Sequence, residues 1–288
     1  MVVNTSEGPY LIFKNGFAQN RKNCFLNSVV QALLAVDAIR DKLSWSIPIE
    51  EELLTLFDKQ EALYKEGIDL NGLKKLLGFC RNQMHDAEEC LVQMMQRFSD
   101  KVKELFQFES KTECICRKCG SSVLTEKNWK SELILAIRPK DQVNMWSDLS
   151  NFTFGQQIQC SNVECNSDGC TVAEKSFYRV PSTLKYLLVK VNLIDDKNRM
   201  LNRVIKGFSS TVNSFRLLQE NNRPMVLKTK LLAVICHNGT DMTSGHYVTY
   251  RLHEKNWYLI DDQNVCYKRN CRLPSCMKNF YILLFEKV

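Results

Sequence analysis

The sequence predicts an α+β protein, because its residue pattern changes twice along the chain. In the N-terminal third, apolar residues recur at steps of three and four, as on a helix with one buried face. The middle third alternates cysteine-rich polar segments with short runs of strand formers, and the last third repeats strand patterns between polar turns. No Pro/Gly-rich linker separates these parts, so we expect one composite domain over residues 1–288.

The composition narrows the class and the location of the protein. The chain has 288 residues, 44% of them hydrophobic, which is enough to bury a substantial core and excludes collagen-like and disordered classes. No apolar run approaches the roughly 18 residues of a membrane helix, and nothing marks export. We therefore expect an intracellular protein, cytoplasmic or nuclear, that does not contact a membrane. In that setting the thirteen cysteines stay reduced and serve as metal ligands or nucleophiles.

The net charge of +7, from 39 Lys and Arg against 32 Asp and Glu, is modest for this length. The cationic residues are scattered along the chain, a distribution typical of a solvated surface. A basic protein with clustered cysteines is also compatible with a nucleic-acid-binding zinc module. Because no single element gathers the positive charge, we expect no nucleic-acid partner.

Helical periodicity predicts four helices in the first third. One begins at Cys24, and the others cover residues 50–64, 70–80 and 86–98. Asp86 suits the N-cap of the last helix, because its short carboxylate can accept from the first free backbone amides.

Strand formers predict an antiparallel sheet in the last third. The expected strands, including one from the middle third, cover residues 131–137, 184–193, 227–236, 246–252, 257–260 and 280–285. Polar residues at 237–239 and 261–264 predict turns. Strands 246–252 and 257–260 are expected to pair as a hairpin around residues 253–255.

Cys24 is a candidate nucleophile because of its position at the first turn of a predicted helix. The positive end of the helix dipole favours the thiolate form there, and Arg21 and Lys22 add positive charge just before it. The alternative interpretation of Cys24 is a small buried hydrophobic residue, the commonest environment of cysteine.

A nucleophilic cysteine needs a base, and His246 is the best placed of the four histidines. It follows a glycine and begins a predicted strand, and the predicted hairpin brings it toward the end of the next strand. There Asp261 or Asp262 can accept the second imidazole N–H and fix the orientation of the ring. The alternative is that both aspartates are ordinary turn residues.

A cysteine cluster in the middle third predicts a metal site. Cys116 and Cys119 form a C-x-x-C pair followed by glycine, a tight turn that directs two thiolates at one ion. A second pair comes from Cys160 and Cys165, or from Cys165 and Cys170. Four thiolates in two pairs fit a closed tetrahedral Zn²⁺ site of structural type. The alternative is a group of reduced cysteines without metal.

Several motifs, taken in order, resemble those of the ubiquitin-specific proteases, which are papain-like cysteine isopeptidases. The resemblance runs from about Gly16 to the C-terminus and includes a cysteine box, an acidic helix-start block, a histidine box and a closing strand. These motifs are Asn23-Cys24-Phe25-Leu26-Asn27-Ser28 with Gln31, residues 84–91, residues 245–250 with Trp257-Tyr258 and residues 261–265, and residues 279–286.

The resemblance implies a papain-like fold with a helical thumb, zinc-stapled β fingers and a β palm, over about residues 16–105, 106–180 and 181–288. It implies cleavage of the isopeptide or peptide bond after the C-terminal Gly-Gly of ubiquitin or a ubiquitin-like modifier. The expected partners are that modifier and its conjugates, and the protein is expected to act as a monomer. For the zinc ligands it favours the pair Cys160 and Cys165, with Cys170 as the alternate.

The resemblance also implies a role for each matching residue. Cys24 is the expected nucleophile, His246 the general base, Asp261 its orienting residue and Asp262 a supporting polar residue. Contacts to the substrate tail are expected from Asp86, Gly245 and Tyr247.

The segment before the nucleophile departs from the family pattern. The family has an asparagine five residues before the cysteine, which donates to the oxyanion; this chain has Gln19 there, followed by Asn20. The family's Gly-Asn-Thr is replaced by Arg21-Lys22-Asn23. Since loss of one oxyanion donor costs about 10²–10³ in rate, the alternative function is a weak or inactive pseudo-protease that binds the modifier or a signalling partner on the same fold.

The identity of the modifier is suggested by shorter likenesses. Residues 69–85, 232–237 and 244–247 are similar to the subgroup that is specific for the interferon-stimulated ubiquitin-like modifier. This chain is therefore expected to act on ubiquitin or on that modifier.

Overall fold

The structure is a computed structural model of the chain. It describes residues 22–61, 69–79, 83–116, 118–125, 128–137, 157–158, 160, 162, 165, 170–192, 213–239, 244–253, 255–268 and 279–288.

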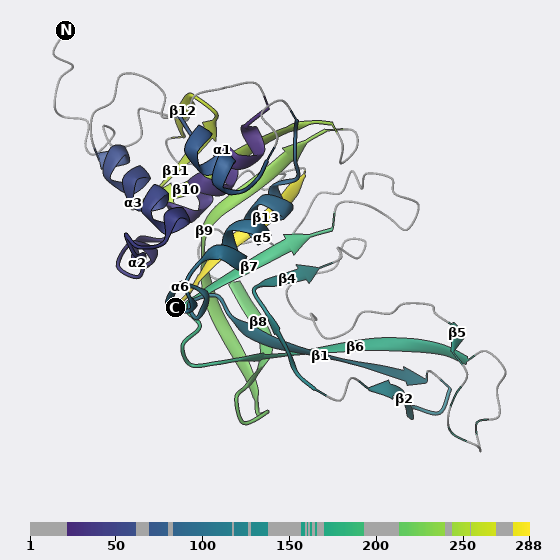
Figure 1. The fold of residues 1–288 in the computed structure, drawn as a ribbon. Helices are drawn as coiled ribbons and strands as arrows, with labels where there is room; N and C mark the ends of the chain where they lie inside the picture. Colours follow the sequence, from purple (N-terminus) through teal and green to yellow (C-terminus); the bar gives the residue numbers. More distant parts are fainter. Residues whose placement is uncertain are drawn as a thin grey trace, which may run out of the picture.

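The helices of the described residues all come before residue 104 (Figure 1). They are α1 (Cys24–Leu33), α2 (Asp37–Arg40), α3 (Pro48–Glu61), α4 (Asn71–Leu76), α5 (Ala87–Arg97) and α6 (Asp100–Lys103). The predicted helix starts are close to those observed. Asp86 caps α5 as expected, because its side chain accepts from the amides of Glu88 and Glu89.

The strands follow the helices along the chain and form one extended, branched sheet. They are β1 (Phe108–Cys116), β2 (Ser122–Thr125), β3 (Lys130–Glu132), β4 (Ile134–Ile137), β5 (Gln157–Ile158), β6 (Cys170–Val180), β7 (Tyr186–Val191), β8 (Asn213–Gln219), β9 (Pro224–Asn238), β10 (His246–His253), β11 (Asn256–Asp261), β12 (Asn264–Lys268) and β13 (Phe280–Lys287).

The main path through the sheet has the order β12-β11-β10-β9-β8-β6-β1-β2, and β13 lies between β7 and β9. The pairs among the strands of the last third are antiparallel, as predicted. The predicted hairpin is also observed: β10 and β11 pair with His253 opposite Asn256. Two parallel pairs, β4 with β7 and β6 with β8, join strands of the middle third to this sheet.

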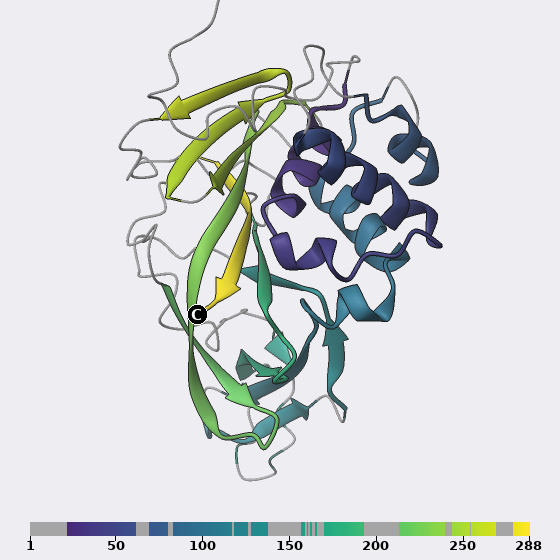
Figure 2. The ribbon, with the colours of Figure 1, turned by 90° about the vertical axis from the view of Figure 1, so that its left-hand side faces the viewer.

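The helices cover one side of the upper part of the sheet, and β1, β2 and β6 extend away from them (Figures 1 and 2). Helix α1 packs against β9, β10 and α5, and each of its ten residues is buried. One hydrophobic cluster runs from α1 to the closing strand β13, so the helical lobe and the β palm share a core. This shared core holds the N-terminus of α1 beside the palm strands.

Two predicted elements differ from those observed. The helix expected over residues 70–80 ends at Leu76, because Gly78 takes a positive φ of 77° that a continuing helix does not allow. The strand expected over residues 131–137 breaks at Leu133, since β3 pairs with β1 and β4 pairs with β7. Among the described helices, none has the length and apolar character needed to cross a membrane.

Candidate active site and cysteine cluster

Cys24 is the first residue of α1, and it is 5% exposed. Asn23 stands at the N-cap, where its backbone carbonyl accepts from the amide of Asn27 at 2.8 Å. Its side chain makes no hydrogen bond to the first-turn amides. The Cys24 thiol therefore lies at the end of the helix where backbone N–H groups point outward.

The imidazole ring of His246 has a hydrogen-bond partner on each side. Its Nε2 lies 2.6 Å from Oδ1 of Asp261, and the ring also hydrogen-bonds to the thiol of Cys24. These contacts, with the thiol as the largest contributor, raise the pKa of His246 to about 9, although burial acts in the opposite direction. The structure thus brings Cys24, His246 and Asp261 together in the order that the sequence predicts for nucleophile, base and orienting residue.

Asp262, the residue after Asp261, contacts α1. Its Oδ1 accepts from Nδ2 of Asn27 at 2.6 Å, and the pair is buried. Burial raises the pKa of Asp262, while Asn27 and His246 act to lower it. Its backbone has a positive φ of 49° in the turn between β11 and β12, which directs successive carboxylates to different partners: Asp261 to His246 and Asp262 to Asn27.

Gly245 precedes His246 where the chain passes closely over a buried ring. A Cβ at this position would lie 2.4 Å from Nε2 of His237, so no other residue fits without a shift. His237 is 1% exposed, and its ring lies 4.6 Å from that of Tyr247, centroid to centroid. The glycine requirement at the start of β10 therefore follows from this lack of space and from the Gly245 φ of 156°, which residues with a Cβ rarely adopt.

Asp86 joins the helical lobe to the palm. Besides capping α5, its carboxylate accepts from the hydroxyl of Tyr247 on β10 at 3.1 Å and from that of Tyr281 on β13 at 2.8 Å. Burial is the main cause that raises the pKa of both phenols, so both remain proton donors. Tyr247 is 1% exposed, so a substrate tail would meet it through its backbone.

The predicted oxyanion residues lie outside what the structure describes. Gln19, Asn20 and Arg21 belong to the segment before residue 22. Lys22, the first described residue, is exposed and has a positive φ of 75°. A left-handed residue without a glycine costs about 1–3 kcal/mol and persists only where neighbouring structure enforces it.

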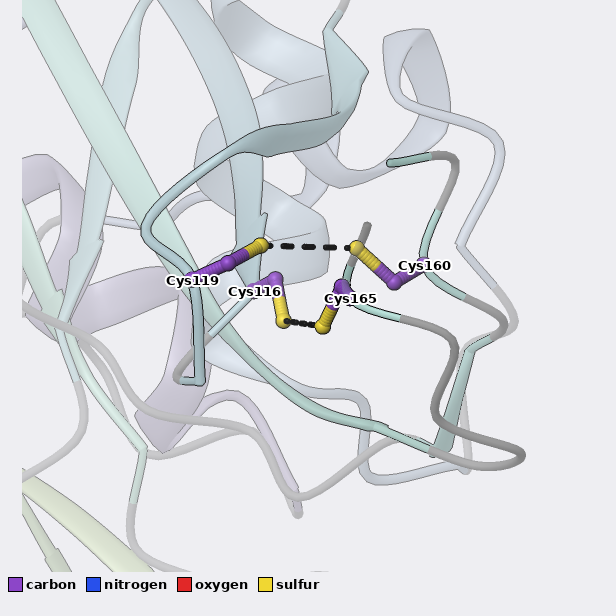
Figure 3. A group of neighbouring side chains, drawn as sticks. All are labelled: Cys116, Cys119, Cys160 and Cys165. Atoms are coloured by element: carbon purple, nitrogen blue, oxygen red, sulfur yellow. Dashed lines mark hydrogen bonds between the residues drawn. The ribbon is translucent and has the colours of Figure 1, made fainter. Parts of the chain in front are cut away.

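Four cysteines from two distant parts of the chain meet in the fingers (Figure 3). The Sγ atoms of Cys116 and Cys165 are 3.8 Å apart, and those of Cys119 and Cys160 are 3.6 Å apart. All four sulfur atoms lie within 4.8 Å of one another. The strands explain the meeting, because β1 and β5 both pair with the first residues of β6.

These distances fit a tetrahedral zinc site. A Zn–S distance of about 2.3 Å places tetrahedral sulfur ligands about 3.8 Å apart, and the observed pairs are within 0.2 Å of that spacing, whereas a disulfide needs about 2.05 Å. Gly120, with a φ of 74°, lets the amide after Cys119 turn back to the carbonyl of Cys116 at 2.9 Å. Hydrogen bonds from Ser121 lower the pKa of Cys119 to about 6. The hydrogen bond from the Asn162 backbone acts to lower the pKa of Cys160, but desolvation and the hydrogen bonds to Cys119, Cys116 and Cys165 outweigh it and raise that pKa to about 12.

The cluster contains the pair Cys160 and Cys165 that the resemblance favours. The alternate, Cys170, begins β6, where its backbone pairs with Ile158, but its side chain is outside the described part.

The sequence assigns no role to three residues that contact the site. Asn27 holds Asp262, Tyr281 holds Asp86, and Lys74 donates to Asn23 at 2.6 Å. In the sequence, Tyr281 is one of several apolar residues of a predicted strand, and nothing there indicates a contact with Asp86. A lysine such as Lys74 is usually exposed to solvent, and only its position on the apolar face of a short helix indicates that it is buried.

Together these features define a cysteine–histidine–aspartate site between a helical lobe and a β palm, with a four-cysteine cluster in the fingers. The ubiquitin carboxyl-terminal hydrolase family profile matches residues 15–285. The chain belongs to this family.

Curated relatives in this family are distant in sequence. Ubiquitin carboxyl-terminal hydrolase 26 of Arabidopsis thaliana is 22% identical over 281 residues, covering 88% of this chain and 26% of the relative. Ubiquitin carboxyl-terminal hydrolase 48 of Danio rerio is 23% identical over 288 residues, covering 82% of this chain and 26% of the relative. The chain thus spans about a quarter of the length of these relatives.

Solved structures show the same fold. A SAGA module of Ubp8, Sgf11, Sus1 and Sgf73 bound to ubiquitin aldehyde matches with a TM-score of 0.70 at 14% identity, over 95% of this chain and 69% of that chain. The corresponding module bound to monoubiquitin matches with a TM-score of 0.69 at 15% identity and the same coverage. The fold expected from the sequence, with helical thumb, fingers and palm, is confirmed.

Proposed function

We propose that this chain is a thiol-dependent hydrolase that cleaves the isopeptide or peptide bond after the C-terminal Gly-Gly of ubiquitin, and so removes ubiquitin from proteins. The observation that carries the proposal is His246, hydrogen-bonded to the thiol of Cys24 and to Asp261. Membership of the ubiquitin carboxyl-terminal hydrolase family supports it.

In the proposed reaction, the proton of Cys24 already resides on His246, and the Cys24 sulfur attacks the carbonyl carbon of the terminal glycine. The imidazolium of His246 then protonates the leaving lysine amine, and a thioester forms. Water activated by His246 hydrolyses the thioester and frees Cys24. Asp261 keeps the ring oriented through both steps, and Asp262 fixes the turn that holds Asp261.

The tail of the modifier is proposed to pass between the thumb and the start of β10. Gly245 leaves this part of the backbone without a side chain, and the backbone of Tyr247 follows it. Asp86, on the opposite side, is within 3.1 Å of the Tyr247 hydroxyl. Donation to the oxyanion is assigned, as a proposal, to Gln19 or Asn20.

Ubiquitin is proposed as the modifier because the matched family and the curated relatives described above are ubiquitin hydrolases by name. These comparisons do not support the narrower resemblance to the subgroup that acts on the interferon-stimulated modifier. The experiment therefore tests the interferon-stimulated modifier as the alternative to ubiquitin.

The four-cysteine cluster is proposed to hold a structural Zn²⁺ through Cys116, Cys119, Cys160 and Cys165. A bound ion would join the β1–β2 turn to the segment before β6 and supply no chemistry to the reaction. We further propose that residues 1–288 work as one catalytic domain, as a monomer, inside the cell. The eight cysteines whose side chains the structure describes form no disulfide, which supports a reducing location.

The experiment is a panel of electrophilic probes, each a modifier with a reactive C-terminus: ubiquitin, the interferon-stimulated modifier and a third ubiquitin-like protein. We expect covalent labelling of Cys24 by the ubiquitin probe, with no labelling of Cys24→Ser. Labelling by another modifier alone would overturn the choice of ubiquitin. A folded protein that binds modifiers but is labelled by none would be the pseudo-protease.

A further inference from the structure

A buried lysine lies directly beside the residue that precedes the nucleophile. Lys74, on α4, is 2% exposed, and its Nζ donates to Oδ1 of Asn23 at 2.6 Å. The same Nζ lies 5.6 Å from the centre of the Phe25 ring, within the range of a cation–π contact. Lys74 thus contacts the residues on both sides of Cys24.

This position is costly for a lysine. Burial of an ammonium requires removal of its water, and the start of α1 carries the positive end of the helix dipole, which repels a cation. A methionine would fill similar space without a charge. Lys75, the next residue on α4, is exposed, so the helix does place a lysine in solvent where burial is not required.

The contact also changes what Asn23 does. An asparagine at an N-cap ordinarily accepts a hydrogen bond from an amide of the first helical turn. Asn23 makes no such bond, and its Oδ1 accepts from Lys74. The first-turn amides of α1 are therefore not covered by this side chain, at the place where negative charge develops during attack by Cys24.

We propose that Lys74 is a positioning residue for the nucleophile. By holding the Asn23 side chain, it keeps the N-terminus of α1 open and fixes the backbone between Lys22, with its φ of 75°, and Cys24. In this chain the Lys74–Asn23 contact supplies the local restraint that a left-handed lysine needs. The proposal rests on the proposed function only in taking Cys24 as the reacting group.

The test uses Lys74→Met in the full chain. Two rates are measured: alkylation of Cys24 by chloroacetamide, followed peptide by peptide in a mass spectrometer, and labelling by the ubiquitin probe. We expect both to fall by about tenfold to a hundredfold, the scale of a small misplacement of a reacting group. Because Lys74→Met leaves the buried Oδ1 of Asn23 without this donor, the thermal unfolding midpoint is expected to fall, and both rates are measured at a temperature well below it. Lys75→Met is the matched control and should leave both rates unchanged.

A double-mutant cycle with Asn23→Ala tests the route of the effect. If Lys74 acts through Asn23, Lys74→Met slows alkylation no further in the Asn23→Ala background. Additive losses, or a wild-type alkylation rate in Lys74→Met, would each overturn the proposal. Failure of the ubiquitin probe on the wild-type chain, with chloroacetamide still slowed in Lys74→Met, would overturn the proposed function and support the role of Lys74.

Discussion

His246 has two partners that both favour its protonated form, because the Cys24 sulfur and the Asp261 carboxylate each accept from the imidazolium. Its pKa in the folded protein is about 9, against 6.5 for an unperturbed histidine. The imidazolium therefore persists between these two pH values, where a free histidine is neutral. Its contribution to stability is complete below pH 6.5 and disappears as the pH rises through about 9.

This shift predicts an alkaline limit of activity. As the pH rises through about 9, His246 loses the proton that the leaving amine needs, so kcat/KM for ubiquitin cleavage should fall. In Asp261→Asn the carboxylate charge is gone, and the fall should begin at a lower pH, with a maximum rate reduced by about a hundredfold. The measurement is the pH profile of kcat/KM for both proteins.

Asp100→Asn serves as the control for that profile, because Asp100 has a 95% exposed side chain on α6, outside the proposed catalytic residues. An alkaline limb at the same pH in the wild type and in Asp261→Asn would contradict the proposed coupling of His246 to Asp261.

At the scale of elements, the sequence predicts best those that bury one regular face. Helix α1 and the hairpin of β10 and β11 follow their apolar patterns, and Asp86 signals the start of α5 correctly. The sequence does not predict β1 and β6 as strands, because their polar and charged residues show no clear alternation. They exist because they pair along eight residue positions with each other, which is a tertiary property.

The link between α5 and the palm predicts a measurable loss of stability. In Tyr281→Phe, Asp86 loses the hydroxyl that lies 2.8 Å away, and the free energy of unfolding should fall by about 2 kcal/mol. Urea unfolding provides the measurement. The fall in unfolding free energy caused by Tyr281→Phe should differ in size in a Tyr247→Phe background, because both hydroxyls donate to the Asp86 carboxylate and their contributions are not additive. Unchanged stability in both single variants would contradict this linking role.

At the scale of the whole molecule, the fingers meet the rest of the chain through β1, β6, β8 and β9, and their outer end is held at the cysteine cluster (Figures 1 and 3). Cys165→Ala should remove one ligand and weaken zinc binding by more than about a hundredfold, since even changes behind the ligands cost about 10–100-fold. Metal content measured together with hydrogen exchange should show zinc loss and faster exchange in β1 and β6.

Cys266→Ala is the matched control, because Cys266 is an exposed free thiol on β12 outside the cluster. It should keep its zinc and its exchange pattern. Full retention of zinc by Cys165→Ala would contradict the proposed ligand set.

The sequence predicts some residues of the candidate site and not others. Cys24, His246 and Asp261 stand out because each occupies an element boundary whose chemistry is local: a helix start, a strand start and a strand end. Lys74 and Tyr281 could not be assigned, because each acts on a residue far along the chain through a contact that only the packed molecule creates.

The fifteen-residue strand β9 has a consequence for the distance between the two ends of the molecule. It pairs with β8 at its start and with β10 at its end (Figure 2). At that end Asn238 lies opposite His246. At about 3.4 Å per residue, fifteen residues span at most about 50 Å. A register shift bends β9 where Ala233 and Leu231 face consecutive residues of β13, but its backbone stays paired on both sides of this bend. Because a paired strand stretches and shortens little, β9 sets the separation between its start beside β8 and the imidazole of His246.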